Sequence, residues 1–249
     1  MSTPIGRTGL SRVTPAAMST LAVVGSMAVA AVFDDFLGDV IADQWNYTEG
    51  TDGATADAAI LAGGPGGVLR MTTGDAGTGL AADLCMITTA LQWRASNGGL
   101  SATAKFKLSQ ITDAYLFFGF TDVVTLEAPI EASGTGNALV SNASNAVGFL
   151  FDTRMTDDKF WLVGVKADVD AVAQNTAVAP VAATDVTLSV LVSTDGTASF
   201  YINDVGVGSA MVNAVTAATM LTPAFAASKT ATATSMTADV DFVGVSMDR

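Results

Sequence analysis

Apolar and polar side chains alternate with period two over residues 186–192, which predicts a strand with one buried face. A turn follows at residues 194–197, where Gly196 can take a positive φ without a Cβ penalty. Residues 199–203 alternate again, and a tight turn at their end leads into a third short strand, residues 205–207. The stretch predicts a β-meander and not a catalytic loop.

The same pattern predicts further short strands along most of the chain. Lys105 and Lys107 flank Phe106, which places two charges on one face of a strand and the ring on the other. Residues 122–145, rich in Gly, Ala, Ser and Asn, predict a long surface loop. Many short strands with glycine turns and no convincing internal helix predict an all-β, antiparallel sandwich. The expected strands are residues 68–73, 83–90, 100–109, 114–121, 146–153, 159–167, 220–227 and 237–248.

Residues 1–32 differ from the rest, and we expect them to form an N-terminal arm in front of a sandwich domain at residues 33–249. They carry two bases followed by an apolar run, residues 16–32, that ends in small residues. Three interpretations remain open: an arm that packs on a partner, which we favour, an arm folded onto its own domain, and a signal or anchor segment. The arm's expected contact residues are Arg7, Arg12, Leu21, Val23, Val24 and Met27.

Charge and composition exclude several classes of function. Residues 33–249 hold 24 acidic and nine basic residues, a balance of −15 (9 − 24) that opposes binding to nucleic acid or anionic lipid. Histidine is absent, which removes the commonest general base and metal ligand. Cys85, the only cysteine, lies in an apolar strand without a histidine to activate it, so we expect it in the core.

The order of these signals resembles the concanavalin A-like lectin/glucanase family, including laminin-G-like domains. The resemblance covers about residues 33–249 and implies a jelly-roll sandwich. Members of this fold include sugar binders, glycosidases and virion proteins, so the fold alone does not settle the function. The resemblance is carried by residues 33–36 with Trp45, residues 147–152, residues 160–163, the meander with its Asp195-Gly196 turn, and residues 239–245.

The glucanase branch of this family implies paired carboxylates on one strand, in the pattern Glu-x-Asp-x-Glu or Glu-x-Asp-x-x-Glu. This chain has only three glutamates, Glu49, Glu127 and Glu131. The last two lie in EAPIEA, where Pro129 disfavours a central strand and no Asp intervenes. We therefore expect a solvated loop there and no enzymatic activity.

Legume-type sugar sites imply Ca²⁺ and an aromatic platform. The weak metal candidates are Asp34 or Asp35 with Asp241, where the first and last strands are expected to pair, and the acids at 157–158 and 168–170. Otherwise no cofactor is expected. Three tryptophans could stack on sugars, but each lies in or beside a strand, which favours core packing: Trp45, Trp93 and Trp161.

An acidic sandwich without a usable active site, joined to an apolar arm, looks like a bacteriophage capsid decoration (cement) protein. We expect it on the capsid exterior, bound to the major capsid protein and to sister copies as a homotrimer or another homo-oligomer, with no nucleic-acid or membrane partner. The alternative is a carbohydrate-binding, lectin-like module with a glycan as partner.

Overall fold

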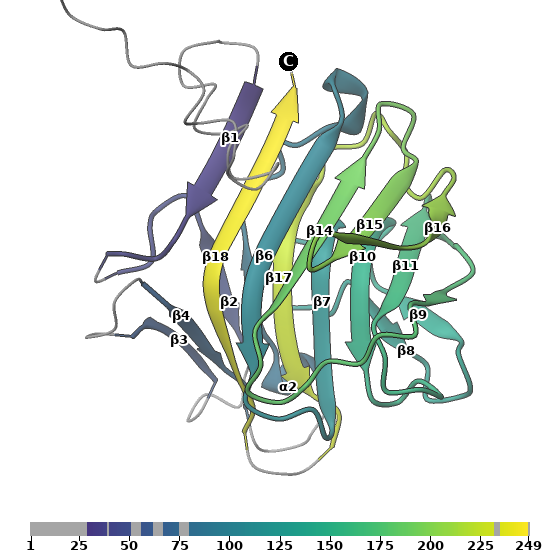
Figure 1. Cartoon of the computed structure of the whole chain (residues 1–249). Coiled ribbons are helices and arrows are strands. Elements are labelled where there is room, and N and C mark those ends of the chain that lie inside the picture. The colour runs from purple at the N-terminus through teal and green to yellow at the C-terminus, as the bar shows by residue number, and fades with distance from the viewer. Residues whose placement is uncertain are drawn as a thin grey trace, which may run out of the picture.

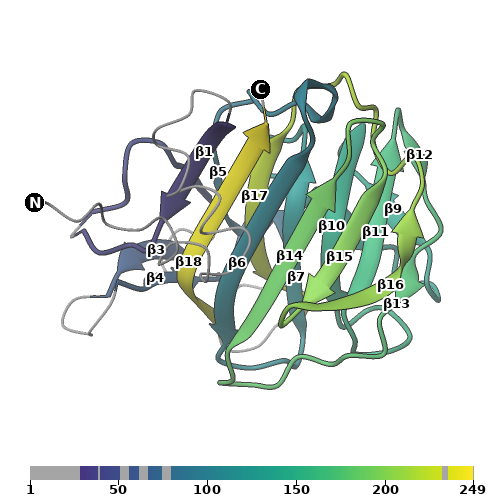
Figure 2. The same ribbon diagram turned by 45° about the horizontal axis from the view of Figure 1, so that its top comes forward.

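The computed structural model describes residues 29–38, 40–50, 56–61, 67–74, 80–231 and 235–248. In this part of the chain, two antiparallel eight-stranded sheets pack face to face as a sandwich (Figures 1 and 2). This confirms the predicted fold class. No helix in the described part is long and apolar enough to cross a membrane.

We call the first sheet the open sheet, because its outer face carries no further layer among the described residues. In order it contains β16 (Val205–Met211), β15 (Ala198–Ile202), β14 (Val186–Val192), β6 (Leu100–Leu108), β18 (Thr237–Asp248), β4 (Leu69–Thr72) and β3 (Asp57–Ile60), while β1 (Val29–Asp34) also pairs with β18.

We call the second sheet the covered sheet. In order it contains β12 (Val169–Asp170), β11 (Trp161–Lys166), β10 (Asn145–Asp152), β7 (Ala114–Thr121), β17 (Thr222–Lys229), β5 (Cys85–Thr88) and β2 (Asn46–Glu49), while β13 (Gln174–Asn175) pairs with β11. The remaining elements are the hairpin β8 (Ile130–Ala132) and β9 (Leu139–Ser141), the short helix α2 (Leu80–Asp83) and a 3-10 turn, Ala95–Asn97.

The predicted meander is present as β14, β15 and β16, which pair in sequence order. Gly196 has φ 85° in the first turn, and Asn203 and Asp204 have φ 50° and 65° in the second. Two consecutive positive φ values are typical of the type I′ hairpin turn, whose twist matches that of the flanking strands. Both turns therefore form where the sequence predicted them.

The first and last strands of the described chain also pair, as expected. Residues 29–34 of β1 run antiparallel to residues 243–248 of β18. Residues 29–32 of the expected arm thus lie in a strand of the open sheet, where Ala30 and Val32 contact the core. Residues 1–28 lie outside the described residues, and so do all six expected arm contacts: Arg7, Arg12, Leu21, Val23, Val24 and Met27.

The main core lies between the sheets and is built from inward-facing side chains of both. Phe106 of β6 meets Phe225 of β17 edge-to-face, with ring centroids 5.0 Å apart. Phe149 of β10 contacts Phe200 of β15 in the same way at 5.5 Å. Such pairs add about 1 kcal/mol each beyond the burial of their area. The period-two pattern of the sequence therefore directs one face of each sheet into this core.

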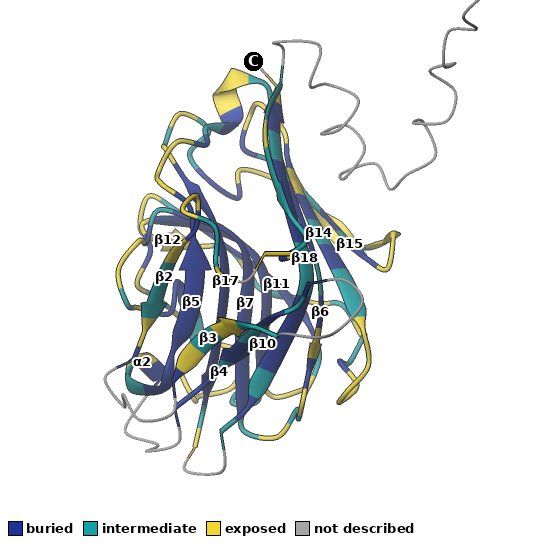
Figure 3. Ribbon diagram, turned by 90° about the vertical axis from the view of Figure 1, so that its left-hand side faces the viewer, coloured by how far each residue is buried: buried dark blue, intermediate teal, exposed yellow. Residues whose placement is uncertain are grey.

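The covered sheet is buried on its outer face as well, which explains why β7, β10 and β17 are buried along their whole lengths (Figure 3). A second apolar cluster lies there, in which Leu150 and Phe117 belong to the sheet, and Ala128 and Ile130 belong to the segment across it. The prediction of a surface loop at residues 122–145 is therefore wrong in part. Alternate residues of this segment are apolar and form a strand that packs on the sheet.

One guanidinium fixes the β8–β9 hairpin to the covered sheet. Arg154 Nη2 donates to Asp152 Oδ2 at 2.7 Å and to Glu131 Oε2 at 2.9 Å. Asp152 is fully buried and also accepts the backbone N–H of Ala132. The hydroxyl of Tyr115 donates to the carbonyl of Ile130. The expectation of a solvated Glu131 is corrected, because its carboxylate is held by this cation.

Replacing Arg154 tests the attachment. Arg154→Met would leave the buried Asp152 carboxylate without its cation, so we expect the free energy of unfolding to fall by about 3 kcal/mol. Lys105→Met is the matched control, because Lys105 pairs with Asp241 on an exposed face, where such a pair contributes only about 0.5 kcal/mol. Denaturant unfolding of both variants measures the difference, and equal losses would contradict the assigned role.

Candidate ligand groove on the open sheet

The outer face of the open sheet carries small hydroxyl side chains on neighbouring strands. The register places Ser246 of β18 opposite Ser101 of β6, and Ser101 opposite Leu191 of β14. Leu191 is in turn opposite Ser199 of β15. Because inward positions of these strands are taken by core residues, alternation sends these four side chains outward.

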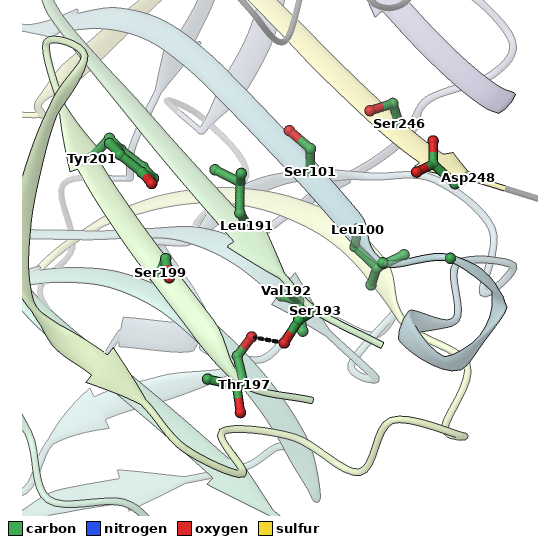
Figure 4. Close-up of a pocket in the computed structure, with 12 residues that line it drawn as sticks. Leu100, Ser101, Leu191, Val192, Ser193, Thr197, Ser199, Tyr201, Ser246 and Asp248 are labelled. Atoms are coloured by element: carbon green, nitrogen blue, oxygen red, sulfur yellow. Dashed lines mark hydrogen bonds between the residues drawn. The ribbon is translucent and has the colours of Figure 1, made fainter. Parts of the chain in front are cut away.

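These side chains line a groove with a volume of ≈ 390 Å³ (Figure 4). Serine hydroxyls form much of its floor, and Leu191, with 41% of its surface exposed, supplies an apolar side. Tyr201 of β15 and Asp248 at the end of β18 also line it. The groove thus offers hydroxyl donors and acceptors, one carboxylate and one aromatic ring.

The turn between β14 and β15 closes one end of the groove and is held by its own hydrogen bonds. The Ser193 hydroxyl donates to the carboxylate of Asp195, which also accepts the backbone N–H of Thr197. These bonds, that of Ser193 first, lower the pKa of the Asp195 carboxyl. Asp195 therefore supports the turn, and its charge is satisfied locally.

Charged side chains on the same face, farther along β6 and β18 from the groove, neutralise one another. Arg70 makes a two-point ion pair with Asp239, with N–O distances of 2.7 and 2.9 Å. Lys105 lies 2.7 Å from Asp241 and 3.7 Å from Asp185. Lys107 adds a third cation, 3.9 Å from Asp239. Three cations thus face three carboxylates, and the face attracts neither sign of ligand strongly.

Most of the weak metal candidates accept hydrogen bonds from protein donors. Asp34 accepts the backbone N–H of Phe36 and the indole N–H of Trp45, and Asp241 accepts Lys105. Among the described residues, no three His, Cys, Asp or Glu side chains gather as a metal site would require. Asp35 lies in the same described stretch and belongs to no such group. The acids at 157, 168 and 170 accept hydrogen bonds from Asn175, Ser144 and Ser141.

The tryptophans do not lie in the groove. Trp45, Trp93 and Trp161 are 6%, 2% and 4% exposed, so their rings cannot stack on a ligand. Sequence reasoning favoured this burial, and it is confirmed. The half-exposed aromatic residues of the open sheet are instead Phe33, Tyr201 and Phe242. Their location could not be found from composition, because it depends on which strand lies next to which.

The glutamates do not form a catalytic pair of the expected kind. Glu49 accepts the hydroxyl of Tyr47, Glu131 is bound to Arg154, and Glu127 is exposed in the turn before β8. At the outward positions of β10, the sheet carries Ala146, Gly148 and Leu150 under the second core. The prediction that the chain is not an enzyme stays a prediction.

No protein-family model matches the chain, and no curated protein matches it. Solved structures do match its shape. The chain is similar to a β-glucanase from Bacillus licheniformis, with TM-score 0.59, 11% identity and coverage of 88% of this chain and 98% of that one. It is similar to peanut lectin, with TM-score 0.54, 12% identity and coverage of 88% and 97%. The carbohydrate recognition domain of Emp47p gives TM-score 0.58, 10% identity and coverage of 90% and 98%.

At these identities the likeness establishes the fold and nothing finer. The protein is a concanavalin A-like jelly-roll sandwich of the kind that glucanases and lectins share. This confirms the fold implied by the family resemblance. The capsid-decoration prediction is not supported by these structures.

Cys85 lies in β5 and is fully buried, as expected. Burial raises the pKa of its thiol to about 12, although a hydrogen bond with Tyr47 opposes the shift. Burial also raises the pKa of Tyr47, whose hydroxyl donates to Glu49. The thiol is therefore neutral and unreactive in the folded chain.

This burial predicts both reactivity and pH dependence. A thiol reagent at about pH 8 should label no Cys85 in the folded protein and the full complement in denaturant. The pKa of Cys85 is higher in the folded chain than in the unfolded chain. The free energy of unfolding therefore keeps its full value with respect to this thiol below about pH 9 and falls as the pH rises toward 12. Thiol titration with and without denaturant measures the first effect, and unfolding at several pH values measures the second. Rapid labelling of the folded chain would contradict the burial.

Proposed function

We propose that the protein is a carbohydrate-binding, lectin-like module and that its glycan lies in the groove on the open sheet. The observation that carries the proposal is the lining of the groove: serine hydroxyls from three strands beside an aromatic ring and an exposed leucine. A sugar ring presents hydroxyl groups around its edge and C–H groups on its faces. This lining matches both.

The serine hydroxyls of the groove can both donate and accept hydrogen bonds, which suits a sugar in particular. A serine hydroxyl both donates and accepts, as does each sugar hydroxyl, so Ser101, Ser199 and Ser246 can adapt to either role. The partial positive charge on sugar C–H groups is attracted to the negative face of an aromatic ring such as Tyr201. Few precisely placed polar groups beside apolar surface are typical of small-molecule sites.

Electrostatics favour a neutral glycan. The chain carries a formal net charge of −13 at pH 7, which repels sulfated or carboxylated glycans. On the same face, Lys105 and Arg70 are held by Asp241 and Asp239, so neither adds a free positive charge to offset that repulsion. The likeness in shape to peanut lectin and to the carbohydrate recognition domain of Emp47p supports the proposal of a carbohydrate ligand.

The other predicted role stays a prediction. The arm residues expected to contact a capsid lie outside the described residues, so the structure gives that role no contact surface. The homo-oligomeric state and the location on a capsid exterior are likewise untested.

Replacing Tyr201 tests the proposal. On an array of neutral glycans the wild-type chain should bind a defined subset, and Tyr201→Ala should lower the affinity for it about tenfold. Tyr201→Phe keeps the ring and should stay within about threefold. Val205→Ala, an exposed position on the edge strand β16, is the control and should bind normally.

Calorimetric titration of the bound glycans gives the affinities, and thermal melts establish that each variant folds. An array without any bound glycan, or a Tyr201→Ala variant that binds as well as the wild type, would refute the proposed function.

A further inference from the structure

One row of side chains crosses the outer face of the open sheet from one edge to the other. Pairing between β1, β18, β6, β14, β15 and β16 sets its order. An aromatic residue begins the row, small residues and hydroxyls continue it, and a second aromatic residue lies near its far end. The row reads Phe33, Gly244, Thr103, Ser189, Tyr201 and Gly206.

Phe33 leans over the neighbouring strand because that strand has a glycine beside it. A Cβ added at Gly244 would lie 3.3 Å from Cδ2 of Phe33, so the ring occupies the space above the glycine. Phe242 supports it from the side, with ring centroids 5.7 Å apart and planes tilted by 31°. Both rings are only partly buried. Together they make an aromatic surface on the sheet.

Tyr201 has the same relation to the next strand. A Cβ added at Gly206 would lie 3.7 Å from Cε1 of Tyr201, so this ring also extends over a glycine. Between the two rings, the hydroxyl of Thr103 donates to that of Ser189 at 2.9 Å. The floor between the aromatic residues is therefore low and polar.

The rows on either side form the borders of this strip. On one side Leu191 projects from β14 into solvent. On the other side lies Lys105, whose ammonium group is held by Asp241. Beyond Tyr201 the strip meets only Gly206, and Phe33 lies on the edge strand β1, so no described side chain of the row blocks either end.

We propose that this strip is an extended binding platform that takes a linear, neutral glycan lying across the strands, with one sugar ring on Phe33 and another on Tyr201. Four strand intervals separate the two aromatic residues, a span of about 19 Å at the usual strand spacing. Such a span accommodates several consecutive sugar rings. This inference rests on the proposed function and adds Phe33 as a second contact, outside the groove.

The chemistry of the strip favours this occupant. Two separated aromatic surfaces suit a ligand with repeated C–H faces. Between them the partly exposed Ser189 hydroxyl, to which the buried Thr103 donates, suits a hydroxyl of an intervening sugar. The ammonium group of Lys105 at the border is paired with Asp241, so it does not attract an anionic chain. A ligand of one or two sugars can reach only one of the two rings.

The test is a chain-length series. Linear glucose, mannose and xylose oligomers of one to six units are titrated by calorimetry against the wild-type protein, Phe33→Ala and Tyr201→Ala. In the series that binds, wild-type affinity should rise with length and level off once both rings are reached. Phe33→Ala should remove that rise, about five- to tenfold for the longest oligomer, and leave the shortest bound oligomer unchanged. Tyr201→Ala should weaken short and long oligomers alike.

Phe33→Leu is the matched variant, since it keeps an apolar side chain against Phe242 but lacks the ring, and it should behave as Phe33→Ala while folding normally. Affinity independent of length, or full binding of the longest oligomer by Phe33→Leu, would overturn the inference. Binding only of short or branched glycans on the array, with sensitivity to Tyr201→Ala, would also overturn it and leave the proposed function standing. Failure to bind any glycan would refute both.

Discussion

A single extra residue in β18 sets which side chains of the open sheet reach solvent. Opposite β6, Val240 pairs with Phe106 and Phe242 pairs with Lys105, so Asp241 is bulged out of register. Side chains alternate with period two, and one inserted residue therefore reverses the faces. Ala238 and Val240 are buried before the bulge, and Val243 and Val245 are buried after it. Without the bulge, half of this strand would turn its valines outward.

The same bulge builds both features of the outer face. It leaves Asp241 and Phe242 half-exposed, where the carboxylate binds Lys105 and the ring supports Phe33. Beyond it, Gly244 and Ser246 alternate outward and provide the place for Phe33 and part of the groove. Since β1 pairs with β18 only beyond the bulge, the N-terminal strand contributes Phe33 to the surface only when the two ends of the chain have met. Such distant pairings are typical of slowly folding β topologies.

The sequence predicted the fold well where the pattern was local. The meander, the strands around it and the burial of Cys85 and Trp161 follow from alternation and turn residues, and all are confirmed. The sequence pattern did not predict features that depend on residues far away along the chain. The apolar alternation at Ala128, Ile130 and Ala132 was outweighed by the loop-like composition around it, because nothing local shows that a sheet face needs covering. Likewise Phe33 predicted the start of a domain, and its outward position over the sheet depends on Gly244, more than 200 residues away.

The outer face of the covered sheet is buried and that of the open sheet is not, and this difference locates the candidate site. The covered sheet carries Leu150 and Phe117 outward, and burying such side chains under a hairpin contributes roughly 2 kcal/mol each. Its outer face is thereby filled, and Arg154 holds the hairpin on it. The open sheet carries hydroxyl side chains at the corresponding outward positions, of which Ser101, Ser189, Ser199 and Ser246 stay partly exposed and Thr103 is buried. Under the proposed function, recognition then falls to the open sheet. In that proposal, specificity comes from the spacing of a few aromatic rings over glycines, because the small hydroxyls between them adapt to many partners.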